Sequence, residues 1–255
     1  QSPGQTKCTE FLRYGAAATT GTVSEPLSLQ QKFPTPFVHL HLARGASVAE
    51  AVYLSVRSPY ELLLIGDPLC APWARAPGVS LLGLVEGQPV SGALELRPRV
   101  TNGVLPAYFQ MFVDGILGGE ARPGQAIRLD TAALSDGPHE LTIVAVAAAA
   151  PQTRGRLRVP FTAQNHGLTL DVRVLAGGRQ PTDAVPFDGR IALQLSCEGA
   201  SSYRVLHNGR TVATAGSDGR AELAAASLGA GPVRLQVRAT AAENREVSGP
   251  DVDLT

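Results

Sequence analysis

The stretch FQMFVDGILGGEARPGQAIRLDTAALSDGPHELTIVAVA, residues 109–147, decides the fold, because most of it occurs a second time further along the chain. At a constant offset of 94 residues, Asp114-Gly115 corresponds to Asn208-Gly209, and the apolar pattern around Leu141 corresponds to the pattern around Leu235. No gap interrupts the match between these landmarks. A constant offset through two turns and a strand predicts one structural unit that is used twice.

Each copy of the unit has the pattern of antiparallel β-structure. The segment RLQVRAT, residues 234–240, alternates apolar and polar side chains with the period of two that lets a strand bury one face. The Asp-Gly and Asn-Gly pairs at 114–115 and 208–209 are hairpin signals, since these residues tolerate positive φ. Short strands separated by Gly- and Pro-rich turns predict β-sandwiches.

We place the two sandwiches at residues 78–164 and 165–255, each near the ~100 residues of an immunoglobulin-like module. A strand of the form GALEL at Gly92 recurs as GRIALQL at Gly189, at an offset of 97 residues. We expect the three-residue difference from the offset of 94 to lie in a loop. The repeat, the VDG turn and the LDTAALSDGPHELTIVAV segment resemble tandem bacterial Ig-like domains. This resemblance implies a spacer, adhesion or glycan-contacting role and brings no catalytic residues.

The composition excludes several classes of protein. Lys+Arg and Asp+Glu number 22 each, and a zero net charge argues against a nucleic-acid binder. The sequence has no run of 18 apolar residues, the length that a membrane-spanning helix needs. Cys8, Cys70 and Cys197 lie too far apart in sequence for a metal-ligand motif, and a Cys8–Cys70 disulfide stays open beside two free thiols.

Residues 1–77 differ in character from the sandwiches. The sequence predicts a short helix ending at Gly15, a strand in AAATTGTV, a capped helix from Ser47 and a strand at 61–65. Helix, strand, helix, strand is the order of a parallel α/β layer. Such a small layer leaves open edges and apolar faces, so we expect an upstream segment or a separate chain to complete it.

This segment also resembles a known family. The runs GAAATTGTVSEP, KFPTPFVHLHLARGASVAEAVYLSV and LLLIGDPLCAPW together resemble the C-terminal part of bacterial caspase-like proteins of the gingipain and clostripain type. The resemblance implies a partial α/β caspase-like domain with an extracytoplasmic location. It also implies that the catalytic His and Cys of such a peptidase lie upstream of the matched segment, so this chain is expected to have no catalytic residues of its own.

Three residues are the candidates for chemistry in this segment. Cys8 with His39 or His41 could form a thiolate–imidazolium pair, against a structural role for each. His39 and His41 alternate in FVHLHLA, so a strand there would place both on one face for a metal with a third ligand. We expect no metal and no cofactor.

Several acidic residues have both a functional and a structural interpretation. Glu25 and Asp67 each precede a proline and are interpreted as turn residues, or as neighbours of a groove completed by a missing half. Asp114, Asp130 and Asp136 could bind an interdomain Ca²⁺. The second copy has Asn or Ala at these places, which favours turn formation.

The sequence therefore predicts a non-catalytic structural or interaction module, extracellular or in the cell envelope, with tandem Ig-like sandwiches behind a caspase-like remnant. Two alternatives stay open: a fragment of a secreted cysteine peptidase, and a subunit of a surface layer or fibre. The expected partners are the chain that completes residues 1–77, proteins or glycans at the sandwiches, and further copies of the chain.

Overall fold

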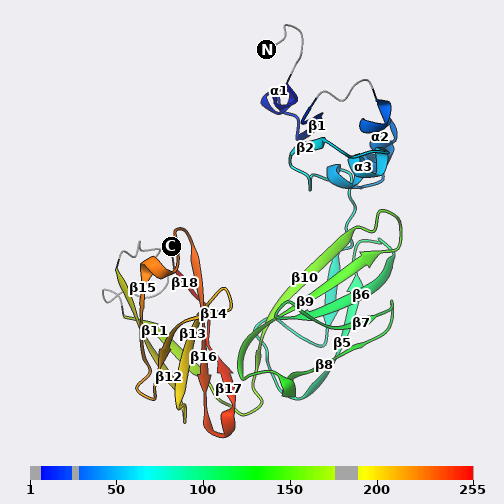
Figure 1. The fold of residues 1–255 in the computed structure, drawn as a ribbon. Helices are drawn as coiled ribbons and strands as arrows, with labels where there is room; N and C mark the ends of the chain where they lie inside the picture. The colour runs from blue at the N-terminus through cyan, green and yellow to red at the C-terminus, as the bar shows by residue number, and fades with distance from the viewer. Residues whose placement is uncertain (1–6, 25–28, 176–188, 255) are drawn as a thin grey trace.

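The structure is a computed structural model that describes residues 7–24, 29–175 and 189–254. Figure 1 shows three parts in chain order: a small helical N-terminal unit, a first sandwich and a second sandwich. Within the described residues, no helix has the length and apolar content needed to cross a membrane.

The first sandwich consists of a five-stranded sheet, in the order β4-β10-β9-β6-β7, facing a three-stranded sheet, in the order β3-β5-β8. All pairs are antiparallel except the short parallel pair of β4 with β10. The strands are β3 (Val79–Leu82), β4 (Pro89–Val90), β5 (Ala93–Val100), β6 (Pro106–Val113), β7 (Ile116–Ala121), β8 (Ile127–Asp130), β9 (Gly137–Ala147) and β10 (Arg154–Ala163), with the 3₁₀ turn η2 (Thr131–Ala133) before β9.

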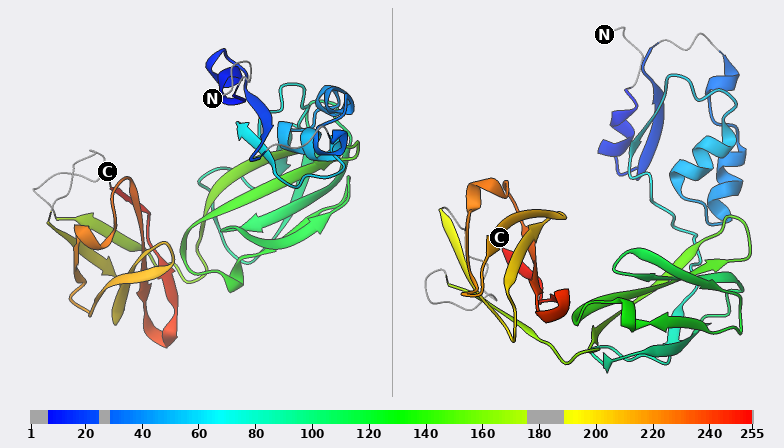
Figure 2. Two further views of the ribbon diagram at one scale, coloured as in Figure 1. Left: turned by 45° about the horizontal axis from the view of Figure 1, so that its top comes forward. Right: turned by 60° about the horizontal axis from the view of Figure 1, so that its bottom comes forward.

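The second sandwich repeats this plan with the sheet β14-β13-β16-β17, to which β18 adds through β16, and the sheet β11-β12-β15. Its elements are β11 (Leu170–Val174), β12 (Arg190–Cys197), β13 (Ser202–His207), β14 (Arg210–Ala215), β15 (Arg220–Ala224), η4 (Ala225–Ser227), β16 (Val233–Thr240), η5 (Ala242–Asn244), β17 (Glu246–Ser248) and β18 (Val252–Leu254). Figure 2 shows both sandwiches as separate two-layered bodies.

The repeat predicted from the sequence is confirmed at the level of backbone detail. Asp114 and Asn208 both have φ of 50°, and the glycine that follows each is also at positive φ. A β-bulge interrupts β6 between Met111 and Phe112, and another interrupts β13 between Val205 and Leu206, at the same offset of 94. The two copies therefore share turn, bulge and strand order.

Each sandwich has a hydrophobic core of its own. Alternate side chains of the central strands β9 and β16 point inward, as the period-two pattern predicted, and Leu141, Ile143, Leu235 and Val237 are at most 1% exposed. The two core clusters share no residue. Burial of this kind is the main stabilising term of a domain, so each sandwich holds its own fold.

The N-terminal unit has two short strands and three short helices. The capping box at Ser47 is confirmed, because the Ser47 Oγ accepts from the Glu50 N–H and the Glu50 carboxylate accepts from the Ser47 N–H. The elements are α1 (Thr9–Arg13), β1 (Ala18–Thr22), the 3₁₀ turn η1 (Gln30–Lys32), α2 (Phe37–Ala43), α3 (Val48–Ser55) and β2 (Leu62–Gly66).

The expected parallel layer is wrong, because β1 and β2 pair antiparallel, from Ala18 opposite Gly66 to Thr22 opposite Leu62. In a parallel α/β unit, one crossover helix returns the chain to the level at which the first strand started, so the second strand runs parallel to the first. Here two helices, α2 and α3, pack against each other between the strands. The chain therefore re-enters at the end of β1, where the Val23 N–H donates to the Glu61 carbonyl.

The predicted strand at FVHLHLA is also wrong, since these residues form helix α2. The apolar pattern of this short segment fits both the period of a strand and the period of a helix. Pro36 before it has φ of −55°, which starts a helix without strain. His39 and His41 are two residues apart on a helix, so their side chains point about 160° apart and share no face.

Separate cores predict separate stabilities. Ile143→Ala should destabilise the first sandwich by about 2–5 kcal/mol, because it leaves a cavity in a packed core, while Leu105→Ala, at a site 78% exposed, should change little. Amide hydrogen exchange in denaturant measures the stability of each sandwich separately. Exchange in β9 should accelerate and exchange in β16 should not; equal acceleration in both strands would contradict independent cores.

Candidate functional site

A polar cluster lies where the two sandwiches meet, and Asp136 is at its centre. Asp136 is 2% exposed at the start of β9. Its carboxylate accepts three backbone N–H groups of the connecting segment, from Asn165 at 2.7 Å and from His166 and Leu168 at 2.9 Å each. Burial opposes its charge most strongly, yet these amide donors prevail and hold the pKa of Asp136 below its ordinary value.

Strand β17 of the second sandwich contacts the same corner. The Ser248 N–H donates to the Asp136 carbonyl at 2.7 Å, and the Ser135 and Ser248 hydroxyls are 2.8 Å apart. Gly137 lies at φ of 120° directly against the Ser248 carbonyl, and a Cβ at this position would overlap that oxygen. The close approach of the two sandwiches therefore requires glycine here.

Asn165 fixes the connecting segment to the first sandwich from a second direction. Its amide donates to the carbonyls of Thr131 at 2.7 Å and Leu134 at 3.2 Å, and its side-chain oxygen is 3.0 Å from the Thr131 hydroxyl. We refer to Ser135, Asp136, Asn165 and Ser248 as the joint. Figure 1 shows the start of β9 and the strand β17 next to each other at this place.

A buried histidine supports the joint from within the first sandwich. The Nδ1 of His139 is 2.6 Å from the Asp114 carboxylate, its Nε2 is 2.8 Å from the Ser135 carbonyl, and its ring stacks on Phe161 with centroids 5.6 Å apart. The Asp114 carboxylate also accepts the Glu140 N–H at 2.9 Å. Burial works against both charges, but the mutual hydrogen bond raises the pKa of His139 and lowers the pKa of Asp114.

Asp114, His139 and Ser135 have the residue types of a catalytic triad, with Nε2 3.5 Å from the Ser135 Oγ. A carbonyl oxygen only accepts, so the 2.8 Å contact with Ser135 places a proton on Nε2. A histidine that already carries this proton is no general base for the serine. The cluster is therefore organised to hold the chain in place.

The candidates from the N-terminal unit do not form a site in the described residues. Cys8 precedes α1, and its Sγ packs beside Gly21 of β1. No hydrogen bond joins Cys8 to His39 or His41, and no group of three His, Cys, Asp or Glu in the described chain is arranged to hold a metal.

The remaining candidates have structural surroundings. Asp67 accepts the Leu69 N–H at 2.9 Å, and Asp130 accepts the Ala132 N–H at 3.1 Å as the N-cap of η2. Glu25 lies outside the described residues. Cys8, Cys70 and Cys197 are free thiols.

His139, Asn165 and Ser135 were not predicted from the sequence as members of a cluster. A signal was present in the comparison of the two copies, because the second copy has Gly229, Ala230 and Val233 where the first has Ser135, Asp136 and His139. Polar residues that one copy has and the other lacks mark a role outside the shared fold.

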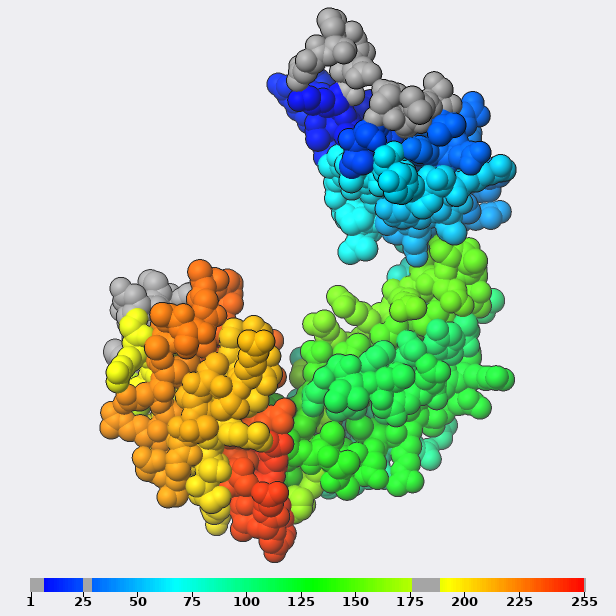
Figure 3. All heavy atoms as spheres, viewed as in Figure 1, coloured from blue at the N-terminus to red at the C-terminus, as the bar shows by residue number. Residues whose placement is uncertain are grey.

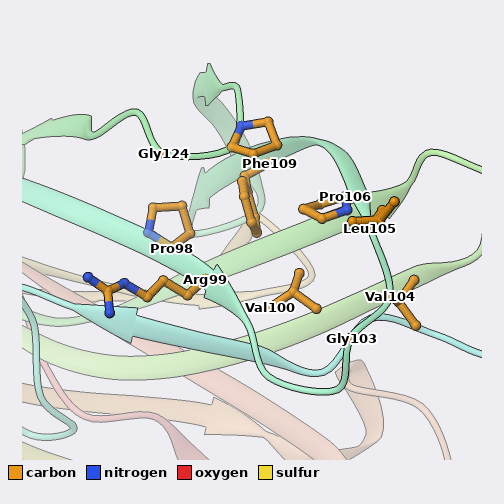
Figure 4. A pocket seen from close by; sticks show the side chains of 10 residues that line it. Pro98, Arg99, Val100, Gly103, Val104, Leu105, Pro106, Phe109 and Gly124 are labelled. Carbon is orange, nitrogen blue, oxygen red and sulfur yellow. The ribbon is translucent and has the colours of Figure 1, made fainter.

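A separate pocket of about 360 Å³ lies at the other end of the first sandwich. Figure 4 shows Pro98, Val100, Pro106 and Phe109 lining it, and Arg99 is its sole titratable residue. An apolar hollow with one cation and no acid, base or nucleophile can contact a ligand but offers no catalytic group.

Solved structures similar to this chain include tandem arrays of Ig-like or fibronectin III-like sandwiches. The fibronectin(III)-like modules of Clostridium thermocellum CbhA are 14% identical over 69% of this chain and 92% of theirs, with a TM-score of 0.31. A chimeric titin Z1Z2 tandem is 16% identical over 70% of this chain and 97% of its own, with a TM-score of 0.40.

A third similar structure is SGBP-B of the Bacteroides ovatus mixed-linkage glucan utilization locus, in complex with a mixed-linkage heptasaccharide. It is 14% identical over 71% of this chain and 48% of its own, with a TM-score of 0.37. Similarities this low carry no argument about function, and none of the three supports the caspase-like resemblance of residues 1–77. No protein-family model and no curated protein matches the chain.

The Asp136 carboxylate should stabilise the protein more than an exposed cap does. Asp136→Ala leaves three amide donors without their acceptor, which costs about 1–3 kcal/mol for each donor that stays buried. Asp130→Ala removes one exposed cap and should cost about 1 kcal/mol. Denaturant unfolding compares the two variants. Equal losses would contradict the central place of Asp136 in the joint.

Proposed function

We propose that the chain is a non-catalytic, extracytoplasmic interaction module, in which the two sandwiches form a stem and the N-terminal unit binds a protein partner. The distribution of apolar side chains carries this proposal. Of 19 exposed large hydrophobic residues in the described chain, 13 belong to the segment 7–74, whereas only 4 of the 37 buried hydrophobic residues do. A unit that exposes most of its apolar residues has the composition of an interface.

The two strands of the unit add a directional argument. β1 and β2 pair only with each other among the described elements, so the outer edge of each strand has free backbone donors and acceptors. Isolated two-stranded sheets are marginally stable, and free edges pair readily with further strands. Leu63 in β2 is 40% exposed and Phe11 in α1 is 54% exposed. We infer a partner that supplies an extended, apolar strand to this edge.

The way the unit is attached fits a presenting role. The Thr153 hydroxyl donates to the Arg75 carbonyl at 2.7 Å, and the Asn102 amide donates to the Ala76 carbonyl at 2.8 Å. The next residue, Pro77, packs against Gly155 of β10. The connection is thus held at the end of the first sandwich, and Figure 3 shows the unit on that end, away from the second sandwich.

The proposal is tested on the protein purified under native conditions with its bound partner. Hydrogen exchange in β1 and β2 should be slow in the native assembly and should accelerate when the partner is removed. Leu63→Asp should weaken the assembly at least tenfold by placing a charge at the edge, while Leu105→Asp, on the first sandwich, should not.

Two outcomes decide the matter. A native monomer whose β1 and β2 amides exchange as slowly as those of β9 would overturn the proposal, because the unit would then be complete alone. An assembly that contains only copies of this chain, and that Leu63→Asp dissociates, would support it with the strand coming from a second copy.

A further inference from the structure

The two ring nitrogens of His139 both face groups that can only accept a hydrogen bond. Nδ1 faces the Asp114 carboxylate at 2.6 Å and Nε2 faces the Ser135 carbonyl at 2.8 Å. A neutral imidazole has one N–H, whereas the imidazolium has two. Both contacts are therefore satisfied only when His139 is protonated.

The Ser135 carbonyl is part of the corner through which the sandwiches touch. The hydroxyl of the same residue meets the Ser248 hydroxyl at 2.8 Å, and the next residue, Asp136, accepts the Ser248 N–H and the amides of the connecting segment. When His139 is neutral, the anionic Asp114 carboxylate is the stronger of the two acceptors and retains the proton on Nδ1. The bond that is lost is then the one from Nε2 to the Ser135 carbonyl, at the corner that contacts Ser248.

We propose that the joint is a pH-sensitive lock: protonated His139 fixes the corner at Ser135 and Asp136 and so holds the second sandwich in place, and neutral His139 releases it.

The second copy supports a role for this cluster outside the sandwich fold. Where the first copy has Asp114 and His139, the second has Asn208 and Val233, and its core forms without them. A sandwich of this type needs no charged pair at this place. The pair is found in the first copy, whose corner contacts the second sandwich through Ser248.

The other charges near the cluster modify the lock without replacing it. Arg238 of β16 opposes the protonation of His139 and attracts Asp114, and it is itself paired with Glu246 at 3.2 Å. His166 lies 3.6 Å from the Asp136 carboxylate and is 41% exposed, so it is a second histidine to control for. Further charged groups in the described structure that act on the cluster are Glu140 with its partner Arg158, and Asp251 with its partner Arg234.

The sign of the pH dependence follows from the direction of each shift. The pKa of His139 is raised in the folded protein, so its stabilisation is complete below the ordinary histidine value and is lost as the pH rises through the raised value. The pKa of Asp114 is lowered, so its contribution is complete above the ordinary aspartate value and is lost as the pH falls through the lowered value. The lock is closed at pH values between the lowered pKa of Asp114 and the raised pKa of His139.

The test uses the full chain and nuclear magnetic resonance. The ring nitrogen chemical shifts of His139 give its titration midpoint. The amide exchange rate of Ser248, corrected for intrinsic rates, measures how often the joint opens. Protection of Ser248 should fall about tenfold per pH unit between the ordinary histidine pKa and the His139 midpoint, and level off above it. The amide of Ile143 in the core should show no such step.

Variants separate the two histidines. His166→Gln should keep the pH dependence of Ser248, and Asp114→Asn should move the His139 midpoint downward. The wild-type titration decides the question even if a variant at His139 fails to fold. A His139 midpoint at or below about 6.5, or Ser248 protection that is flat across the midpoint, would overturn the proposal.

Discussion

A carboxylate buried between two domains must be surrounded by donors, and this requirement organises the molecule. Asp136 is 2% exposed, and its partners in the described part of the chain are backbone amides of the connecting segment and an exposed histidine. An ionised group in such surroundings is stable only while those donors stay in place. The segment between the sandwiches is thereby bound to the first sandwich, and the second sandwich meets the same corner through Ser248.

The comparison of the two copies separates the features of the sandwich fold from the side chains that form the joint. Both copies use the same hairpin turn, the same bulge and the same inward apolar positions, so these features belong to the sandwich itself. Asp136 and His139 have no counterparts in the second copy, where Ala230 and Val233 stand. The first copy thus has polar groups at an end that contacts the second sandwich, and it still has a hydrophobic core of its own.

The repeat, the sandwich class, the hairpin turns and the capped helix at Ser47 were predictable, because local periods and turn residues determine them. The orientation of β2 was not, since it depends on how α2 and α3 pack on each other. FVHLHLA is too short to distinguish strand from helix by period. The joint combines Ser135, Asn165 and Ser248, which only the tertiary fold brings together, although the differences between the copies already pointed to Asp136 and His139.

The account rests on a fixed relation between the two sandwiches. Residual dipolar couplings, measured on the whole chain at a pH below the His139 midpoint, test this relation most directly. If the joint holds, the amides of β9 and of β16 fit one alignment tensor with the same magnitude and orientation. Separate tensors of different magnitude for the two sandwiches would show that they move independently and would contradict the account.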